Sequence, residues 1–171
     1  MTDDYRRLWQ LLPWGDNRVP NIPKKIVIHC MGEYLDIGPD LAAQYKTQPG
    51  IYHASMWLNI TKLSAHALIS PTGVIIRHRK DNEVAWHAKG HNYDTLGAEF
   101  LVKGVWTWGP WAERIKTPYL EPAQFDAGQE QVSEWIKQWN IHEITTHHAL
   151  DPDRRPDPGD GFPFAEFHQM L

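Results

Sequence analysis

Short runs of apolar and β-branched residues predict the strands of this chain. Lys25–Cys30 (KIVIHC) is apolar at consecutive positions, which is typical of a strand buried on both faces. Two further runs within 63–78 flank Pro71-Thr72-Gly73, a turn sequence that predicts a hairpin. Gly97–Val102 (GAEFLV) and Glu143–His147 (EITTH) are also strand-like.

Three other segments have the pattern of helices. From Pro122 to Trp139 the apolar residues recur every three or four positions, and proline stands at the first helical position. A shorter helix is expected over 40–47 (DLAAQYKT), ending before Pro49-Gly50, and another over Phe164–Leu171. Strands mixed with helices predict an α/β domain built on one central sheet.

Length and composition fit a single folded domain. The chain has 171 residues, within the roughly 100–200 residues of one domain, and 42% of them are hydrophobic. Residues 1–22 are polar and unpatterned and are expected to form an N-terminal arm, so the folded domain would span 23–171. The single cysteine, Cys30, excludes a disulfide framework and an all-cysteine zinc site.

Charge and hydropathy exclude two classes of partner. Lys and Arg number 17 against 21 Asp and Glu, a balance that does not fit binding to nucleic acid. No stretch approaches the about 18 consecutive apolar residues of a membrane span, so no membrane insertion is expected. The N-terminus lacks the basic and apolar regions of a secretory signal, and we expect a monomer that is cytoplasmic when made.

Ten histidines and nine tryptophans make a chemical site worth seeking. His29 ends one predicted strand, His147 lies near the end of another, and Asp157 follows in a loop rich in Pro, Asp and Gly. Two imidazoles and one carboxylate, with water in the fourth place, form a known catalytic zinc pattern. On spacing alone, histidines with ordinary structural roles are the simpler interpretation.

Five motifs occur in an order that points to a family. Together they resemble the zinc-dependent N-acetylmuramoyl-L-alanine amidases of type 2, which include phage lysozyme-type amidases, muropeptide-recycling amidases and peptidoglycan recognition proteins. The resemblance covers residues 24–168 and implies a single α/β domain with a central mixed β-sheet flanked by helices. The motifs are VIHC (27–30), LSAHALISPTG (63–73), AWHAKGHN (85–92), LGAEF (96–100) and HHALDPDRRPDPG (147–159).

The resemblance also implies roles for individual residues. His29, His147 and Asp157 match the ligands of a Zn²⁺ cofactor, and Glu99 matches the glutamate that serves as general base. Arg155 stands where hydrolases of the family often carry lysine, which keeps the charge but changes its geometry.

Several assignments around the metal have alternatives. His148 is the neighbour of His147, and on a strand the two would point to opposite faces. Asp151 and Asp153 could replace Asp157 as a ligand, although solvated or capping roles suit them better.

Aromatic residues near the cleft are candidates for substrate contact. Trp86 and His87 match a stretch beside the cleft of the family, although an indirect or packing role suits His87 equally well. Trp108 lies with Trp106 and Trp111 in a predicted Gly/Pro loop, which could form an aromatic wall for a sugar or peptide, or a hydrophobic plug.

The reaction implied by the resemblance is hydrolysis of the amide between N-acetylmuramic acid and L-alanine in peptidoglycan. The expected setting is a phage endolysin that attacks the bacterial cell wall after release. The alternatives are a cytosolic amidase that recycles muropeptides and a protein that binds peptidoglycan without cutting it. A contact of residues 1–22 with a protein partner is a further possibility.

Overall fold

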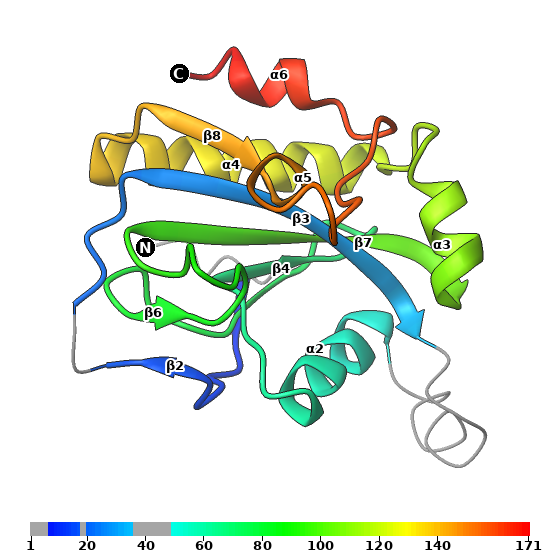
Figure 1. Cartoon of the computed structure of the whole chain (residues 1–171), viewed down its shortest axis with the longest axis horizontal. Coiled ribbons are helices and arrows are strands. Elements are labelled where there is room, and N and C mark those ends of the chain that lie inside the picture. The colour runs from blue at the N-terminus through cyan, green and yellow to red at the C-terminus, as the bar shows by residue number, and fades with distance from the viewer. Residues whose placement is uncertain (1–6, 18–19, 36–48) are drawn as a thin grey trace.

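A six-stranded mixed sheet runs through the centre of the molecule (Figure 1). The structure is a computed structural model and describes residues 7–17, 20–35 and 49–171. All neighbouring strands of the sheet run parallel except β5 and β4, which are antiparallel. The spatial order is β1 (Arg7–Trp9), β5 (Ile75–Arg77), β4 (Ala67–Ile69), β7 (Thr95–Trp106), β3 (Lys25–Leu35) and β8 (Glu143–Thr146).

The central mixed sheet with helices on both faces confirms the predicted fold class. The hairpin around Pro71-Thr72-Gly73 is present as the β4/β5 pair. Strands β3 and β7 both continue beyond the predicted runs, because they remain paired with each other as far as Leu35 and Trp106.

Part of the segment expected to be an unpatterned arm belongs to the folded body. Residues Arg7–Trp9 form β1 and pair with β5, and β2 (Gly15–Asp16) pairs with β6 (Val84–Ala85) in a small second sheet. In the segment that connects β1 to β2, the Trp14 indole donates a hydrogen bond to Asn59 Oδ1 at 2.8 Å. Three-residue and two-residue strands carry too little pattern to be visible in the sequence.

The helices agree with the prediction at the C-terminal end and differ elsewhere. α4 (Pro122–Trp139) begins at its proline and ends before Asn140, which takes the left-handed conformation common at helix ends. α6 (Phe164–His168) is also present, and none of the helices in the described part of the chain has the length and apolar character needed to cross a bilayer.

Besides the short α5 (His147–Leu150), two longer helices, α2 and α3, were not predicted from the pattern. Gly50 begins α2 (Gly50–Ile60), where the sequence interpretation placed the end of a helix, and the predicted helix over 40–47 lies outside the described residues. α3 (Trp108–Arg114) replaces the predicted Gly/Pro loop, because Pro110 lies in its first turn, where the missing amide proton is tolerated.

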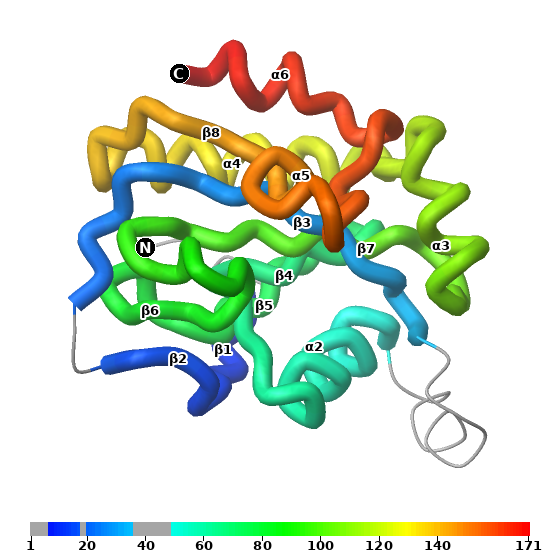
Figure 2. Tube along the Cα trace, viewed as in Figure 1, coloured from blue at the N-terminus to red at the C-terminus, as the bar shows by residue number. Residues whose placement is uncertain are grey.

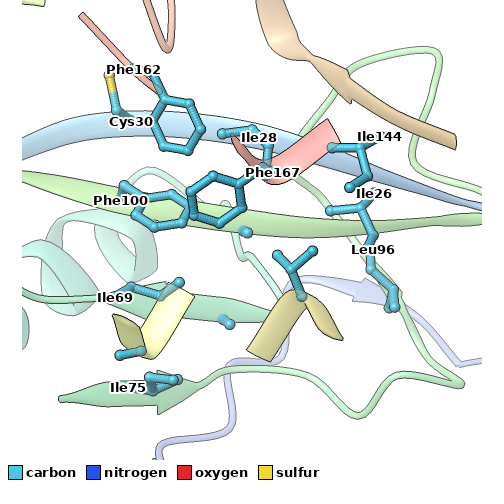
Figure 3. Packing of buried hydrophobic residues seen from close by; sticks show 14 of the residues in the cluster. Ile26, Ile28, Cys30, Ile69, Ile75, Leu96, Phe100, Ile144, Phe162 and Phe167 are labelled. Atoms are coloured by element: carbon cyan, nitrogen blue, oxygen red, sulfur yellow. The ribbon is translucent and has the colours of Figure 1, made fainter. Parts of the chain in front are cut away.

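The larger hydrophobic core lies between the sheet and helices α3, α4 and α6. Side chains at alternate positions of β3 and β7 point to this face, among them Ile26, Ile28 and Phe100. Phe100 makes edge-on ring contacts with Phe162 and Phe167, and the three rings close the core beneath α6 (Figure 3). The alternation leaves Val27, His29 and Met31 on the opposite face of β3.

The opposite face of the sheet is covered less completely. Helix α2 packs Ile51, Ala54 and Leu58 against Met31 and Leu101, forming a second core cluster. The α5 turn (His147–Leu150) lies beside β3 and β8, as the tube trace shows (Figure 2). The candidate functional site lies on this face, between α2 and α5.

Candidate metal centre

Three side chains that the sequence placed far apart converge on one point. His29 Nδ1 lies 2.9 Å from His147 Nδ1 and 3.4 Å from Asp157 Oδ2, and the last two atoms lie 2.9 Å apart. All three residues are buried. In the described part of the chain, these are the His, Cys, Asp and Glu side chains close enough to share a metal ion.

The spacing of the three atoms fits a zinc ion. With metal–ligand bonds of about 2.0–2.1 Å in a tetrahedral site, neighbouring ligand atoms lie about 3.3 Å apart. The observed separations of 2.9, 2.9 and 3.4 Å are close to this value. Two imidazole nitrogens and a carboxylate oxygen are also donors that zinc commonly takes.

The protonation states suit metal ligation as well. Burial lowers the pKa of His29 to about 4, so its imidazole is neutral at pH 7. Burial opposes ionisation of Asp157, but its interactions with His147 and His29 outweigh that effect and hold the pKa of the carboxyl below its usual range. A neutral imidazole and an ionised carboxylate are the forms that bind a cation.

The strand register places His147 beside His29. Strand β8 pairs with β3 up to Thr146, which lies opposite Ile28. Strand β3 continues to Leu35, so His29 lies in the middle of β3 and not at its end. Strand β8 ends at Thr146, one residue before the position that would pair with His29. His147 follows at that point and opens α5, so the expectation that it lies on a strand is wrong.

His148 does not reach the cluster, although the physical reason differs from the one expected. At the start of α5, His147 is buried and faces His29, whereas His148 is exposed. His148 Nδ1 lies 2.7 Å from the carbonyl oxygen of Arg155, and its backbone amide donates to the carbonyl of Asp157 at 2.8 Å. His148 thus holds the loop that carries the third side chain.

Two side chains of the larger hydrophobic core contact the loop that carries Asp157. The Tyr119 hydroxyl donates to the Pro158 carbonyl at 3.1 Å, and the Cys30 thiol lies 3.6 Å from the same oxygen. Asp151 instead pairs with Arg154, and Asp153 is exposed, so neither joins the cluster.

Glu99 and Arg155 line the cavity next to the three side chains. Glu99 on β7 is the register partner of His29 on β3, which directs both to the same face of the sheet. Burial, reinforced by the charge of Asp157, raises the pKa of Glu99 well above its usual range, and Arg155 opposes the rise. Among the described residues, Arg155 Nε is buried and has no hydrogen-bond partner.

The cavity has a volume of about 340 Å³ and is walled by indoles. Trp86 and Trp108, expected to contact substrate, lie at its mouth with 40% and 61% of their surface exposed. Trp57 was missed because its helix, α2, was not predicted. The full set of indoles is Trp57, Trp86, Trp106, Trp108 and Trp111.

His87, the remaining candidate for substrate contact, lines the cavity but also meets His29 directly. Its Nδ1 atom lies 2.9 Å from His29 Nε2, on the far side of the His29 ring from His147.

Comparison with known proteins assigns a family. A model of the N-acetylmuramoyl-L-alanine amidase family matches residues 19–160. No match was found among curated protein sequences.

Solved structures resemble the whole fold. A selenomethionine derivative of AmpD has a TM-score of 0.67 at 22% identity, over 98% of this chain and 95% of that one. The endolysin amidase LysCS from Clostridium intestinale has a TM-score of 0.61 at 19% identity, over 95% and 93% of the two chains. Drosophila peptidoglycan recognition protein SD has a TM-score of 0.57 at 16% identity, over 89% and 83%.

The geometry predicts that His147 and His148 differ in their effect on metal content. His147→Ala should abolish stoichiometric zinc binding because it removes one of three converging donors, whereas His148→Ala, the matched control, should retain one zinc per chain. Inductively coupled plasma mass spectrometry on zinc-loaded, desalted samples measures both. Equal zinc content in the two variants would contradict the assigned donor set.

Proposed function

Because the chain belongs to the N-acetylmuramoyl-L-alanine amidase family, we propose that it hydrolyses the amide between N-acetylmuramic acid and L-alanine in peptidoglycan. The observation that carries the proposal is the convergence of His29, His147 and Asp157 beside Glu99 and Arg155 in one cavity. The proposed cofactor is Zn²⁺, held by His29, His147 and Asp157. Such an ion supplies a Lewis acid that polarises the scissile carbonyl and makes water a better nucleophile at neutral pH.

Glu99 is the proton carrier of the proposed reaction. Its carboxylate accepts a proton from the attacking water and returns it to the amide nitrogen, so that the stem peptide leaves as an amine. Burial raises the pKa of Glu99, which makes the carboxylate a stronger base and its acid form available for the second transfer. Glu99 shares register with His29, so the base lies beside the metal donors without being one of them.

Arg155 is proposed to stabilise the negative charge that develops on the carbonyl oxygen. The Arg155 side chain lines the cavity together with Glu99 and the three metal donors, which places its positive charge beside the proposed reaction centre. A preorganised donor of this kind typically contributes about 10²–10³-fold in rate. The guanidinium in place of the lysine common in the family supplies the same charge with a planar set of donors.

The indole walls fit a ligand with sugar and peptide parts. Trp86 and Trp108 at the cavity mouth offer flat apolar surfaces with one polar edge each, which suit the faces of a sugar ring or a peptide stem. Leu35, Leu58 and Leu63 add further apolar surface to the wall.

The setting proposed for this activity is that of an endolysin, made in the cytoplasm and acting on the wall after release. The fold is similar to that of the endolysin amidase LysCS and also to that of AmpD, so muropeptide recycling is kept as the alternative setting. The likeness to a peptidoglycan recognition protein raises binding without cleavage as a second candidate. The presence of three metal donors together with a buried glutamate favours an enzyme over a binding protein.

Substrate preference distinguishes these settings. Amide cleavage should be faster on insoluble sacculi than on soluble anhydro-muropeptides at matched concentrations of stem peptide, measured by mass spectrometry of released peptides that begin with L-alanine. Faster cleavage of the soluble substrate would indicate a recycling enzyme, and binding to sacculi without release of peptide would indicate a recognition protein.

A second prediction separates proton transfer from metal binding. Glu99→Gln should retain zinc and the fold but lose about 10²–10⁴-fold in kcat, because the amide cannot accept the proton of water. Zinc content and peptide release are measured on the same samples.

Arg155→Lys is the matched control for that prediction. It alters a neighbouring polar group but keeps the positive charge, so it should retain a good part of the rate with zinc still bound. Near wild-type turnover by zinc-loaded Glu99→Gln would show that another group carries the proton.

A further inference from the structure

A continuous chain of hydrogen bonds runs behind His29, away from the cluster. His29 Nε2 contacts His87 Nδ1 at 2.9 Å, and His87 Nε2 contacts Thr95 Oγ1 at 3.0 Å. Thr95 Oγ1 in turn lies 2.8 Å from the backbone carbonyl of His91. Thr95 and His29 are both almost fully buried, with 1% of their surface exposed.

The direction of this chain follows from its last member. A carbonyl oxygen can only accept, so the one hydroxyl proton of Thr95 is donated to His91. Thr95 Oγ1 must therefore accept a proton from His87 Nε2. A neutral imidazole carries one proton, so His87 Nδ1 is an acceptor and His29 Nε2–H donates to it. The lone pair of His29 then lies on Nδ1, the atom that faces His147 and Asp157.

The surrounding backbone is shaped to hold the His87 ring in this place. The amides of His87 and Ala88 both donate to Asn92 Oδ1, at 3.0 and 2.8 Å. Gly97 on β7 leaves room for the ring, because a Cβ atom at this position would lie 2.7 Å from His87 Cγ and Nδ1. The His87 ring meets the His29 ring edge-on, with an interplanar angle of 85°.

We propose that His87 is a positioning residue which, together with Thr95, fixes the tautomer of His29 that presents Nδ1 to the metal. This inference rests on the proposed zinc centre, and it gives His87 a role other than the substrate contact first expected. Partners of this kind behind a metal-bound imidazole typically contribute about 10–100-fold to metal affinity. The role requires an acceptor at the position of His87 Nδ1 and does not require His87 to meet the substrate.

Two variants of His87 separate positioning from other roles. His87→Leu removes the acceptor and should weaken zinc binding by about 10–100-fold in a competition titration against a chromogenic chelator. His87→Asn places an amide oxygen near the former Nδ1 and should recover most of that affinity. Unchanged zinc affinity with a raised KM or a reduced kcat would overturn the proposal and indicate contact with substrate.

A metal-free measurement tests the chain independently of the proposed function. In the ¹⁵N spectrum of zinc-free wild-type protein at pH 7.5, His29 should carry its proton on Nε2, and Thr95→Val should redistribute the tautomers while Thr95→Ser keeps them. A proton on His29 Nδ1 in the wild type would overturn the proposal. If the wild type bound no zinc but showed the Nε2–H tautomer, the zinc centre would fail and the hydrogen-bond chain would stand.

Discussion

The pairing of β3 with a parallel strand on each side is the constraint on which the site depends. On one side it sets Glu99 of β7 next to His29, and on the other it ends β8 opposite Ile28, so that His147 comes out beside His29. A shift of one residue in either pair would turn the side chains concerned to the other face of the sheet. The register is fixed by Ile26, Ile28 and Phe100, which must point into the larger core.

Burial also sets the protonation states of the groups in this site. The cluster lies on a face of the sheet that α2 and the α5 loop cover, so its groups are largely withdrawn from water. Desolvation keeps His29 neutral and raises the pKa of Glu99, while Asp157 stays ionised through its two histidine partners. Donors held in fixed positions in such surroundings need little rearrangement when charge develops in a reaction.

The parts of the fold with strong local signals could be predicted from the sequence. The apolar run at Lys25–Cys30 and the helical spacing from Pro122 to Trp139 correspond to β3 and α4. Helix α3 was not predicted because its Gly and Pro residues are typical of loops. Strand β1 was not predicted because it is short and depends on pairing with β5, about 70 residues away in the sequence.

For the candidate site, the order of the motifs identified residues that the structure brings together. It did not predict which elements and contacts bring them together. His29, His147 and Asp157 meet as the resemblance implied, yet His147 reaches the cluster from a helical turn. The contact between His87 and His29 depends on a loop passing over Gly97 on β7, and no local pattern encodes such an approach. Long-range contacts of this kind are what the sequence pattern alone does not specify.

The most direct test of the account is a crystal structure of the zinc-loaded protein with anomalous data collected at the zinc absorption edge. One strong peak is expected about 2.0–2.2 Å from His29 Nδ1, His147 Nδ1 and a carboxylate oxygen of Asp157. The absence of a peak there, or a peak bound by His148 or through Nε2 of His29, would contradict the proposed zinc site.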